Sequence, residues 1–246
     1  QTREHAPELF AIHPMHALEA EEEIVFLSDA FLSHVPESGA HVPDYRSWLD
    51  TQDLAPAYDH LHLVLQLLQW QKRLRGEPAT RWVLKTPAHL GYLDTLRARF
   101  PGLHLVHLHR DPQETIPSGA SLNTVLHRMH SDDVDPGRVG RDWLERMGWT
   151  HDRALDARLR WVEDPTAPRV TDVAFREVVA DPWPQVARVY ADLGAELTDE
   201  AESSMRAWLD RRPPDPRRPA YGPEDFGLSR ERIAERFARE NPFCQY

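Results

Sequence analysis

The 246-residue chain has a single cysteine and no long run of apolar residues. Cys244 has no second cysteine to pair with, so an internal disulfide framework is excluded and a reducing compartment is expected. No apolar run approaches the about 20 residues that a membrane-spanning helix requires. The sequence therefore predicts a cytoplasmic globular protein with no stable insertion into a membrane.

Positive charge is also scarce in this chain. Forty Asp and Glu residues stand against 29 Lys and Arg residues, which gives a net charge of −11, and the only lysines are Lys72 and Lys85. Such a balance argues against nucleic acid or an anionic membrane as the main partner. An anionic ligand would need a local positive pocket, and its binding should weaken as salt is added.

Glycine is sparse and scattered. The 11 glycines form no Gly-x-x-x-x-Gly-Lys-Ser/Thr pattern and no other small-residue loop that would wrap a phosphate with backbone N–H groups. Hydrophobic residues make up 41% of the chain and charged residues 28%, which is ordinary for a globular domain. We therefore expect one large domain, whose anion-binding groups are side chains.

The segment 103–118 is the most informative part of the chain. Residues 103–109 predict a buried strand that Pro112 ends, and 113–127 has helical spacing. Arg110 then lies at the carboxyl end of a strand, with Ser118 in or near the first turn of the next helix. A guanidinium and a hydroxyl at such an edge suit a phosphate dianion. The alternative is a strand end whose arginine only caps the sheet.

A second segment has the same form. Residues 81–85 predict a short strand ending in Lys85, and 91–100 predicts a helix. Strand, helix, strand, helix is the order of a parallel sheet, so Lys85 and Arg110 are expected at the same edge. In a chain that otherwise uses arginine, this lysine indicates a need for a compact point charge. A solvated lysine at a strand end is the alternative.

The remaining elements divide the single domain of residues 1–246 into three regions. Residues 1–78 predict a helical segment, 79–182 hold the sheet, and 183–246 predict further helices. We expect helices at 14–32, 45–49 (capped by Asp44), 55–75 (with an apolar stripe through Leu61, Leu65 and Leu68), 138–160, 185–193, 199–210 and 230–239, a strand at 171–175, and a Pro/Arg-rich covering loop at 212–219.

Taken together, these motifs resemble the bacterial branch of the sulfotransferases. The resemblance is carried by Lys85-Thr86-Pro87 and by His109-Arg110-Asp111-Pro112 with Ser118 eight residues after the arginine. Further similar segments are 13–22, 45–49, 65–71, 172–182 and 221–228. The resemblance implies a P-loop NTPase-like three-layer α/β fold with a central parallel sheet. It also implies the co-substrate 3′-phosphoadenosine 5′-phosphosulfate and no metal.

The largest departure from that family is at the amino-terminal side. Sulfotransferases open with a strand, a loop that holds the 5′-phosphosulfate, and a helix, and no such unit is recognisable after Gln1. We expect this first strand–helix unit, about 30 residues or more, to be missing from the sequence. Any catalytic carboxylate that it carries would be missing too.

The resemblance assigns roles to four residues. Arg110 and Ser118 would bind the 3′-phosphate, and Lys85 would neutralise charge on the transferred sulfonate. Cytosolic relatives have a histidine two residues after this lysine, whereas this chain has Pro87 there. His89 is close enough in sequence to be considered as the base, but a carboxylate in the expected missing unit is the favoured choice.

Two further positions differ from the family pattern near the nucleotide. Phe175 stands where relatives commonly have a tyrosine near the adenine, so it is expected to stack on the purine, or alternatively to be plain core. Pro219 stands where relatives often have a histidine, two residues before Tyr221. A phosphate contact in that loop would then fall to Arg217 or Arg218.

Polar residues near the amino terminus give weaker signals. His13 and His16 are three apart but have no third ligand, so we expect no metal there and assign them to the lining of an acceptor pocket. Glu21 to Glu23 are expected to form a solvated face.

The sequence thus predicts a sulfotransferase that uses a hydroxyl or amine of a small-molecule or lipid-like acceptor. The apolar amino-terminal helices favour the lipid-like choice. The alternatives are a non-catalytic nucleotide-binding relic or interaction protein, and a phosphotransferase of the same fold. The acceptor's identity and the oligomeric state are not encoded in any motif that we recognise.

Overall fold

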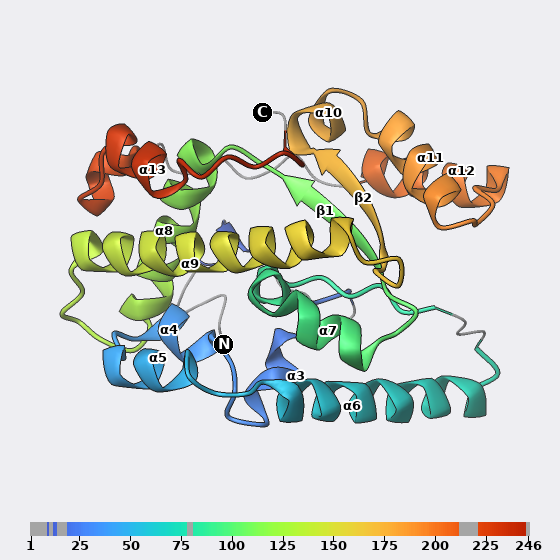
Figure 1. Ribbon diagram of the computed structural model, residues 1–246, viewed down its shortest axis with the longest axis horizontal. Coiled ribbons are helices and arrows are strands. Elements are labelled where there is room, and N and C mark those ends of the chain that lie inside the picture. The colour runs from blue at the N-terminus through green and yellow to red at the C-terminus, as the bar shows by residue number, and fades with distance from the viewer. Residues whose placement is uncertain (1–8, 10–11, 14–18, 78–80, 212–220, 245–246) are drawn as a thin grey trace.

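The computed structural model describes residues 9, 12–13, 19–77, 81–211 and 221–244. A long helix, α9 (Pro136–Val162), crosses the middle of the molecule (Figure 1). Above it in that view lie two strands and the carboxyl-terminal helices, and below it lie the amino-terminal helices α3 to α6. This helix therefore separates the sheet from the helical amino-terminal region.

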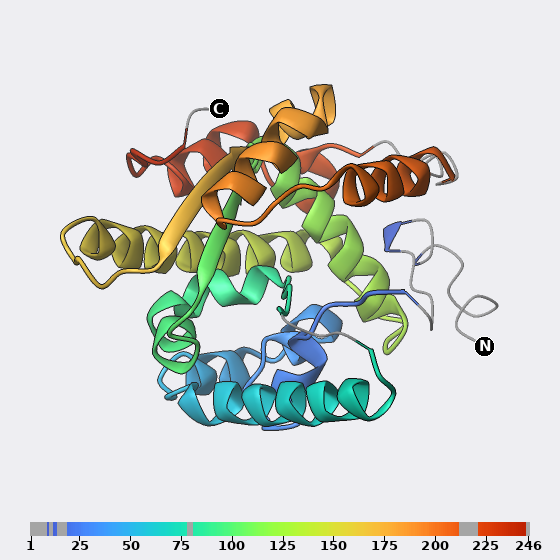
Figure 2. The same ribbon diagram turned by 90° about the vertical axis from the view of Figure 1, so that its right-hand side faces the viewer.

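The sheet of the described chain has two parallel strands, β1 (His104–His109) and β2 (Arg169–Ala174). Their register pairs His104 with Arg169 and His109 with Ala174, and they run side by side across α9 in Figure 2. The connection between them consists of α8 (Pro112–Arg128) and α9, as parallel strands require. The predicted α/β class and the strands at 103–109 and 171–175 are confirmed, with small shifts of the ends.

Three helices begin with the same local sequence, an aspartate followed by a proline. Asp111, Asp135 and Asp181 are the N-caps of α8, α9 and α11 (Pro182–Asp192), and each side chain accepts a hydrogen bond from a backbone N–H two residues on. The proline that follows is favourable in the first turn because its missing N–H needs no partner there. These starts are decided locally, which is why the predicted helices at 113–127, 138–160 and 185–193 are confirmed.

The helices below α9 enclose the largest apolar core. They are α3 (Ile24–Ser28), α4 (Val35–Gly39), α5 (Pro43–Leu49), α6 (Ala55–Leu74), the 3₁₀ helix η1 (Pro87–Tyr92) and α7 (Leu93–Arg99). Leu27, Leu49 and Tyr58 are almost fully buried there. The predicted stripe of α6 is confirmed, because Leu61 and Leu65 are buried and Leu68 is half-buried. Each fully buried leucine contributes about 1.5–3 kcal/mol to folding.

The predicted helix over 14–32 is wrong. Within the described part of that range only Ile24–Ser28 is α-helical. The helix begins after Glu23, whose buried carboxylate accepts a hydrogen bond from the backbone N–H of Lys85, and Phe31 has a φ of 56° that turns the chain away. The helix at 45–49 is confirmed, but it begins at Pro43, so Asp44 lies in its first turn instead of capping it.

The predicted strand at 81–85 is also wrong, although its side chains alternate as in a strand. Trp82 and Leu84 are half-buried, whereas Val83 is 90% exposed. No described strand lies beside this extended segment to complete a ladder. The backbone N–H of Lys85 is instead bound by the side chain of Glu23. The alternation of apolar and polar residues therefore predicted correctly which side chains are buried. A strand, however, also needs a neighbouring strand for its backbone hydrogen bonds.

The carboxyl-terminal region consists of short helices around the strands and α9. They are α10 (Phe175–Ala180), α11, α12 (Asp199–Arg211), the 3₁₀ helix η2 (Pro223–Phe226) and α13 (Arg230–Arg236). The helix predicted at 199–210 is confirmed, and that at 230–239 ends three residues early. Phe175, expected at a strand end, is the first residue of α10. The covering loop predicted at 212–219 lies outside the described residues.

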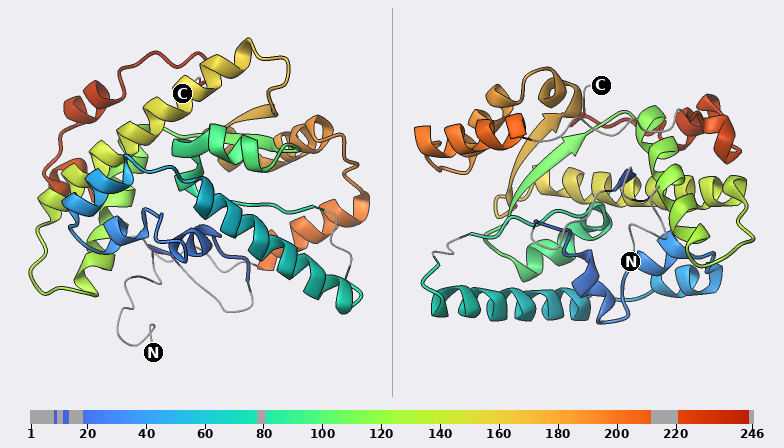
Figure 3. Two further views of the ribbon diagram at one scale, coloured as in Figure 1. Left: turned by 60° about the horizontal axis from the view of Figure 1, so that its bottom comes forward. Right: turned by 180° about the vertical axis from the view of Figure 1, so that it is seen from behind.

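Figure 3 shows how the two sides of the molecule are joined. Helix α8 begins just after β1 and descends to α4, which it contacts. One helix thus connects the strand end that carries Arg110 with the amino-terminal helices. In the described residues no helix is both long and apolar enough to cross a membrane.

Candidate functional site

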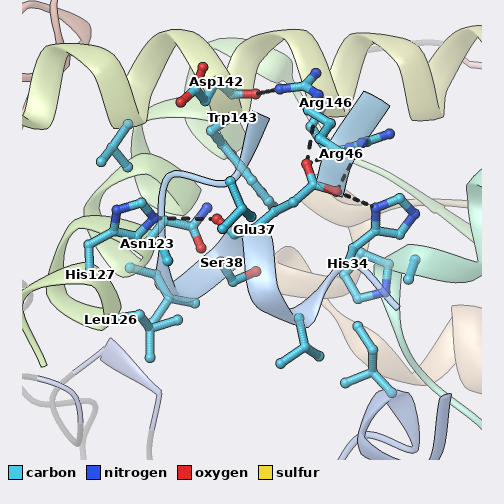
Figure 4. A pocket seen from close by; sticks show the side chains of 18 of the residues that line it. His34, Glu37, Ser38, Arg46, Asn123, Leu126, His127, Asp142, Trp143 and Arg146 are labelled. Carbon is cyan, nitrogen blue, oxygen red and sulfur yellow. Dashed lines mark hydrogen bonds and ion pairs between the residues drawn. The ribbon is translucent and has the colours of Figure 1, made fainter. Parts of the chain in front are cut away.

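A cavity of about 520 Å³ lies between α8, α9 and the amino-terminal helices (Figure 4). We call it the large cavity. Its wall is mostly apolar, with polar groups at a few places. The lining residues used below are Glu21, Glu22, His34, Glu37, Arg46, Leu122, Asn123, Leu126, His127, Asp142, Trp143 and Arg146.

One side of the large cavity is a buried ionic network centred on Arg146. This side chain on α9 is 3% exposed. Its Nε and Nη2 donate to Glu37 at 3.0 and 2.9 Å, and its Nη1 donates to Asp50 at 2.7 Å. His34 Nδ1 lies 2.9 Å from Glu37 as well. Burial opposes ionisation of Glu37, but the hydrogen bonds from His34 and Arg146 outweigh it and hold the pKa of Glu37 below its usual range.

The predicted catalytic lysine lies beside a carboxylate that lines the large cavity. Lys85 Nζ donates to Glu22 Oε1. The lysine side chain is 73% exposed and that of Glu22 is 19% exposed. The expected solvated face at Glu21 to Glu23 is therefore wrong for Glu23, which is buried, and for Glu22, which is half-buried and contacts Lys85. Glu21 is exposed, as expected, and both Glu21 and Glu22 line the cavity. The three consecutive glutamates in the sequence did not indicate which of them would be buried.

His89 is held at both ring nitrogens. Nδ1 lies 2.9 Å from the hydroxyl of Tyr58, and Nε2 lies 2.6 Å from Glu23 Oε1. Burial opposes ionisation of Glu23, but hydrogen bonds from His89 and from the N–H of Lys85 outweigh it and lower the pKa of Glu23. His89 is itself buried. To take a proton from an acceptor, His89 would first have to release one of these partners.

The structure brings together two of the residues predicted to bind the nucleotide. The guanidinium of Arg110, just after β1, lies 4.5 Å from the centre of the Phe175 ring. Its Nε donates to Glu114 at 3.1 Å. Ser118 is half-buried in the second turn of α8, and the described residues show no hydrogen bond between it and Arg110. We call Arg110, Ser118 and Phe175 the nucleotide side.

A tightly bonded cluster lies directly before Arg110 on the strands. Arg158 donates to both oxygens of Asp172, and its Nη1 also lies 2.9 Å from His107 Nδ1. His109 Nε2 lies 2.7 Å from Asp172. Two histidines and an aspartate at such distances resemble a metal-ligand set. The guanidinium already occupies the position of the cation, so the cluster is structural.

The remaining predicted residues are only partly described. His13 lines the large cavity, as expected, whereas His16 lies outside the described residues. Arg217, Arg218 and Pro219 also lie outside them, so their predicted contact stays a prediction.

Residues 1–199 match the sequence profile of the sulfotransferase family. Two curated relatives carry the name omega-hydroxy-beta-dihydromenaquinone-9 sulfotransferase Stf3, from Mycobacterium bovis and from Mycobacterium tuberculosis. Each is 27% identical over 159 residues, which are 62% of this chain and 38% of the relative. The chain thus spans well under half the length of these proteins.

Two crystal structures have similar folds. Sulfotransferase STF1 from Mycobacterium tuberculosis H37Rv has a TM-score of 0.77 and 32% identity, over 92% of this chain and 56% of that chain. Sulfotransferase STF9 from Mycobacterium avium has a TM-score of 0.77 and 28% identity, over 89% of this chain and 54% of that chain. The described fold is therefore that of about half of each of these sulfotransferases.

Proposed function

The chain belongs to the sulfotransferase family, and we propose that it transfers a sulfuryl group from 3′-phosphoadenosine 5′-phosphosulfate to the hydroxyl of a lipid-like acceptor. The observation that carries this proposal is the contact of Lys85 with Glu22 at the wall of a large, mostly apolar cavity. It supports the proposal because a cation that could act on the sulfonate is next to a carboxylate that could take the acceptor proton.

The nucleotide side has the chemistry to bind the donor's 3′-phosphate. Arg110 is held by one ion pair to Glu114, and its terminal nitrogens have no partner among the described residues. A phosphate could accept from them in a charge-assisted, two-point contact, and Ser118 on α8 would add a hydroxyl. Phe175 already packs against the guanidinium, so a purine would extend a stack that is present.

The large cavity supports a lipid-like acceptor. Apolar side chains dominate its wall, and about 520 Å³ is in the range of pockets that enclose a small molecule. The Stf3 relatives are named for a menaquinone-derived acceptor, which is a lipid. An apolar chain would release water from this wall, while its hydroxyl would lie near Glu22.

In the proposed reaction the acceptor oxygen attacks sulfur and the bond from sulfur to the phosphate oxygen breaks. Glu22 takes the proton of the attacking hydroxyl, and Lys85 stabilises the negative charge that develops around the sulfonate. We propose Glu22 as the base in place of His89, because both ring nitrogens of His89 are engaged. His89 instead positions Glu23, which binds the backbone N–H of Lys85.

The test is product formation with a sulfur-labelled donor and a long-chain alcohol. Glu22→Gln should lower kcat about 10²–10⁴-fold, since it keeps the shape but not the base. Lys85→Met should lower kcat about 10²–10³-fold. Lys72→Met is a matched control because Lys72 pairs with Glu77 on the surface, and it should leave kcat unchanged. Full activity of Glu22→Gln would overturn the assignment of the base.

A second candidate function is nucleotide binding without catalysis. It is favoured by the lack of a glycine-rich phosphate loop in this sequence. Calorimetry with 3′,5′-adenosine bisphosphate distinguishes the two: binding with no sulfated product would favour the non-catalytic role. A single domain for residues 1–246, a cytoplasmic location and the absence of a metal and of a nucleic-acid partner belong to the same proposal.

A further inference from the structure

The wall of the large cavity contains an amide that has no hydrogen-bond partner among the described residues. Asn123 on α8 is 5% exposed, and its side chain makes no hydrogen bond to any described residue. It stands between the apolar lining residues Leu122 and Leu126. Buried amides normally have a hydrogen-bond partner, because burying one unpaired costs free energy.

The titratable groups near Asn123, His127 and Glu37, are already engaged with other residues. Figure 4 shows Asn123 and His127 on the side of α8 that faces Glu37 and Ser38 of α4. His127 Nε2 lies 3.3 Å from the backbone oxygen of Glu37 and donates to it. Burial lowers the pKa of His127, which keeps the ring neutral. The carboxylate of Glu37 is bound by His34 and Arg146.

The charged groups of this wall are paired as well. Arg46 donates to the backbone oxygen of Asp142 at 3.0 Å and lies 3.7 Å from Glu37. Each guanidinium nitrogen of Arg146 already donates to Glu37 or Asp50. An anionic ligand would have to displace one of these partners. A neutral oxygen, in contrast, can form a hydrogen bond with Asn123 without displacing any of these partners.

The indole of Trp143 is a different case. Its Nε1 is buried and also has no partner among the described residues. A side chain on Gly119 would lie 2.2 Å from this atom, so the nitrogen is packed against the backbone of α8. A ligand in the cavity could not reach it. Asn123 is therefore the buried amide of this wall that is available to a ligand.

We propose that Asn123 binds a second, neutral oxygen of the acceptor, a ketone or a hydroxyl separate from the hydroxyl that receives the sulfuryl group. The inference rests on the proposed function and narrows its substrate class to lipid-like alcohols with a second oxygen function. An amide suits both kinds of oxygen because its NH₂ donates and its carbonyl accepts. Asn123 is then a specificity-determining residue.

Binding of two matched ligands tests this without turnover. The probes are a long-chain primary alcohol and a set of its analogues in which one ketone is moved along the chain. The readout is calorimetry. The wild type should bind the best keto-alcohol about tenfold more tightly than the plain alcohol, the effect of one neutral hydrogen bond in a buried site. Asn123→Leu should abolish that preference and bind the plain alcohol as the wild type does.

A matched control separates recognition from a general change in the cavity. Leu126→Ala removes apolar wall next to Asn123 and should weaken both kinds of ligand by the same factor, with the tenfold preference preserved. Equal binding of all probes by the wild type, or equal weakening of all by Asn123→Leu, would overturn the inference. If the wild type keeps the preference but forms no sulfated product, Asn123 binds as proposed and the proposed function is wrong.

Discussion

The nucleotide side and the large cavity are built in opposite ways. Arg110, Glu114 and Ser118 come from one strand end and the helix that follows it, so they are neighbours in the sequence. The residues of the cavity wall range from Leu9 to Thr150 in the sequence and come from short helices, η1, α8 and α9. The first region is a local motif on a parallel sheet, whereas the second exists only after the helices pack.

The two regions also differ in how their arginine side chains are buried and paired. On the nucleotide side a half-exposed arginine has one exposed partner, Glu114, and keeps donors free for a ligand. In the cavity wall Arg146 is buried and fully paired. Substitutions in the Arg146 network should therefore change folding stability, and substitutions on the nucleotide side should change ligand binding.

The largest expected effect is that of Arg146→Met on stability. The variant leaves Glu37 and Asp50 buried without their cation, which should lower the free energy of unfolding by about 3–5 kcal/mol. Urea unfolding followed by fluorescence measures it. Arg141→Met on the same helix is the control, since its pair with Asp135 is on the surface and is worth at most about 1 kcal/mol. Equal losses in the two variants would contradict the network's role.

Arg110→Ala should change nucleotide binding but hardly stability. Loss of the charge-assisted contact should weaken 3′,5′-adenosine bisphosphate by about 1.5–3 kcal/mol in calorimetry. Glu114→Gln should act in the opposite direction, because it frees the Arg110 guanidinium from its partner. Arg128→Ala, exposed at the far end of α8, serves as the control. Unchanged affinity in Arg110→Ala would remove the nucleotide side from the proposal.

Acid should loosen the strands of the nucleotide side before the cavity wall. Burial, with His109 and Arg158 nearby, lowers the pKa of His107 from 6.5 to about 3. Between these values the unfolded chain binds a proton that the folded protein does not, so stability falls as pH falls through this window, by roughly 1 kcal/mol per pH unit.

The variant His107→Asn tests this, since it keeps a hydrogen-bond acceptor for Arg158 but cannot titrate. Its unfolding free energy should vary less between pH 7 and pH 4 than that of the wild type. His130→Asn, at an exposed position, should behave as the wild type does. The low pKa of Glu37 also makes stability fall in acid, but over a different pH range. Its stabilisation is fully present above the pKa that Glu37 has in the unfolded chain, and it is lost as pH falls through the lower pKa of the folded protein. Parallel pH profiles for wild type and His107→Asn would contradict the prediction.

The smallest expected effect belongs to Ser118→Ala. One neutral hydroxyl bonded to a phosphate should be worth about 0.5–1.5 kcal/mol of nucleotide affinity, below the effect of Arg110→Ala. Ser121→Ala, one turn further along α8 at a buried position, is the comparison for a change in the helix itself. Should Ser118→Ala bind the nucleotide as the wild type does, the hydroxyl has no part in the contact.

Several elements were predictable because their signals are local. The aspartate–proline starts of α8, α9 and α11 and the apolar runs of β1 and β2 decide their conformation from a few neighbouring residues. The strand predicted at 81–85 failed because its missing partner is not a local property. The helix predicted at 14–32 failed because Glu23 is buried by contacts with Lys85 and His89, more than sixty residues away.

By itself, the amino-acid sequence determined the sequence-local half of the proposed site: the strand end with Arg110, the helix with Ser118 and the likeness to sulfotransferases. Only the tertiary structure decided which of two adjacent glutamates is buried and which meets Lys85, and which polar residue of α8 is left for a ligand. Asparagine in a helix interior is a weak helix former, and this is the one sequence signal that could have singled out Asn123. The physical reason is that burial and pairing of a side chain are set by distant segments, which no local pattern records.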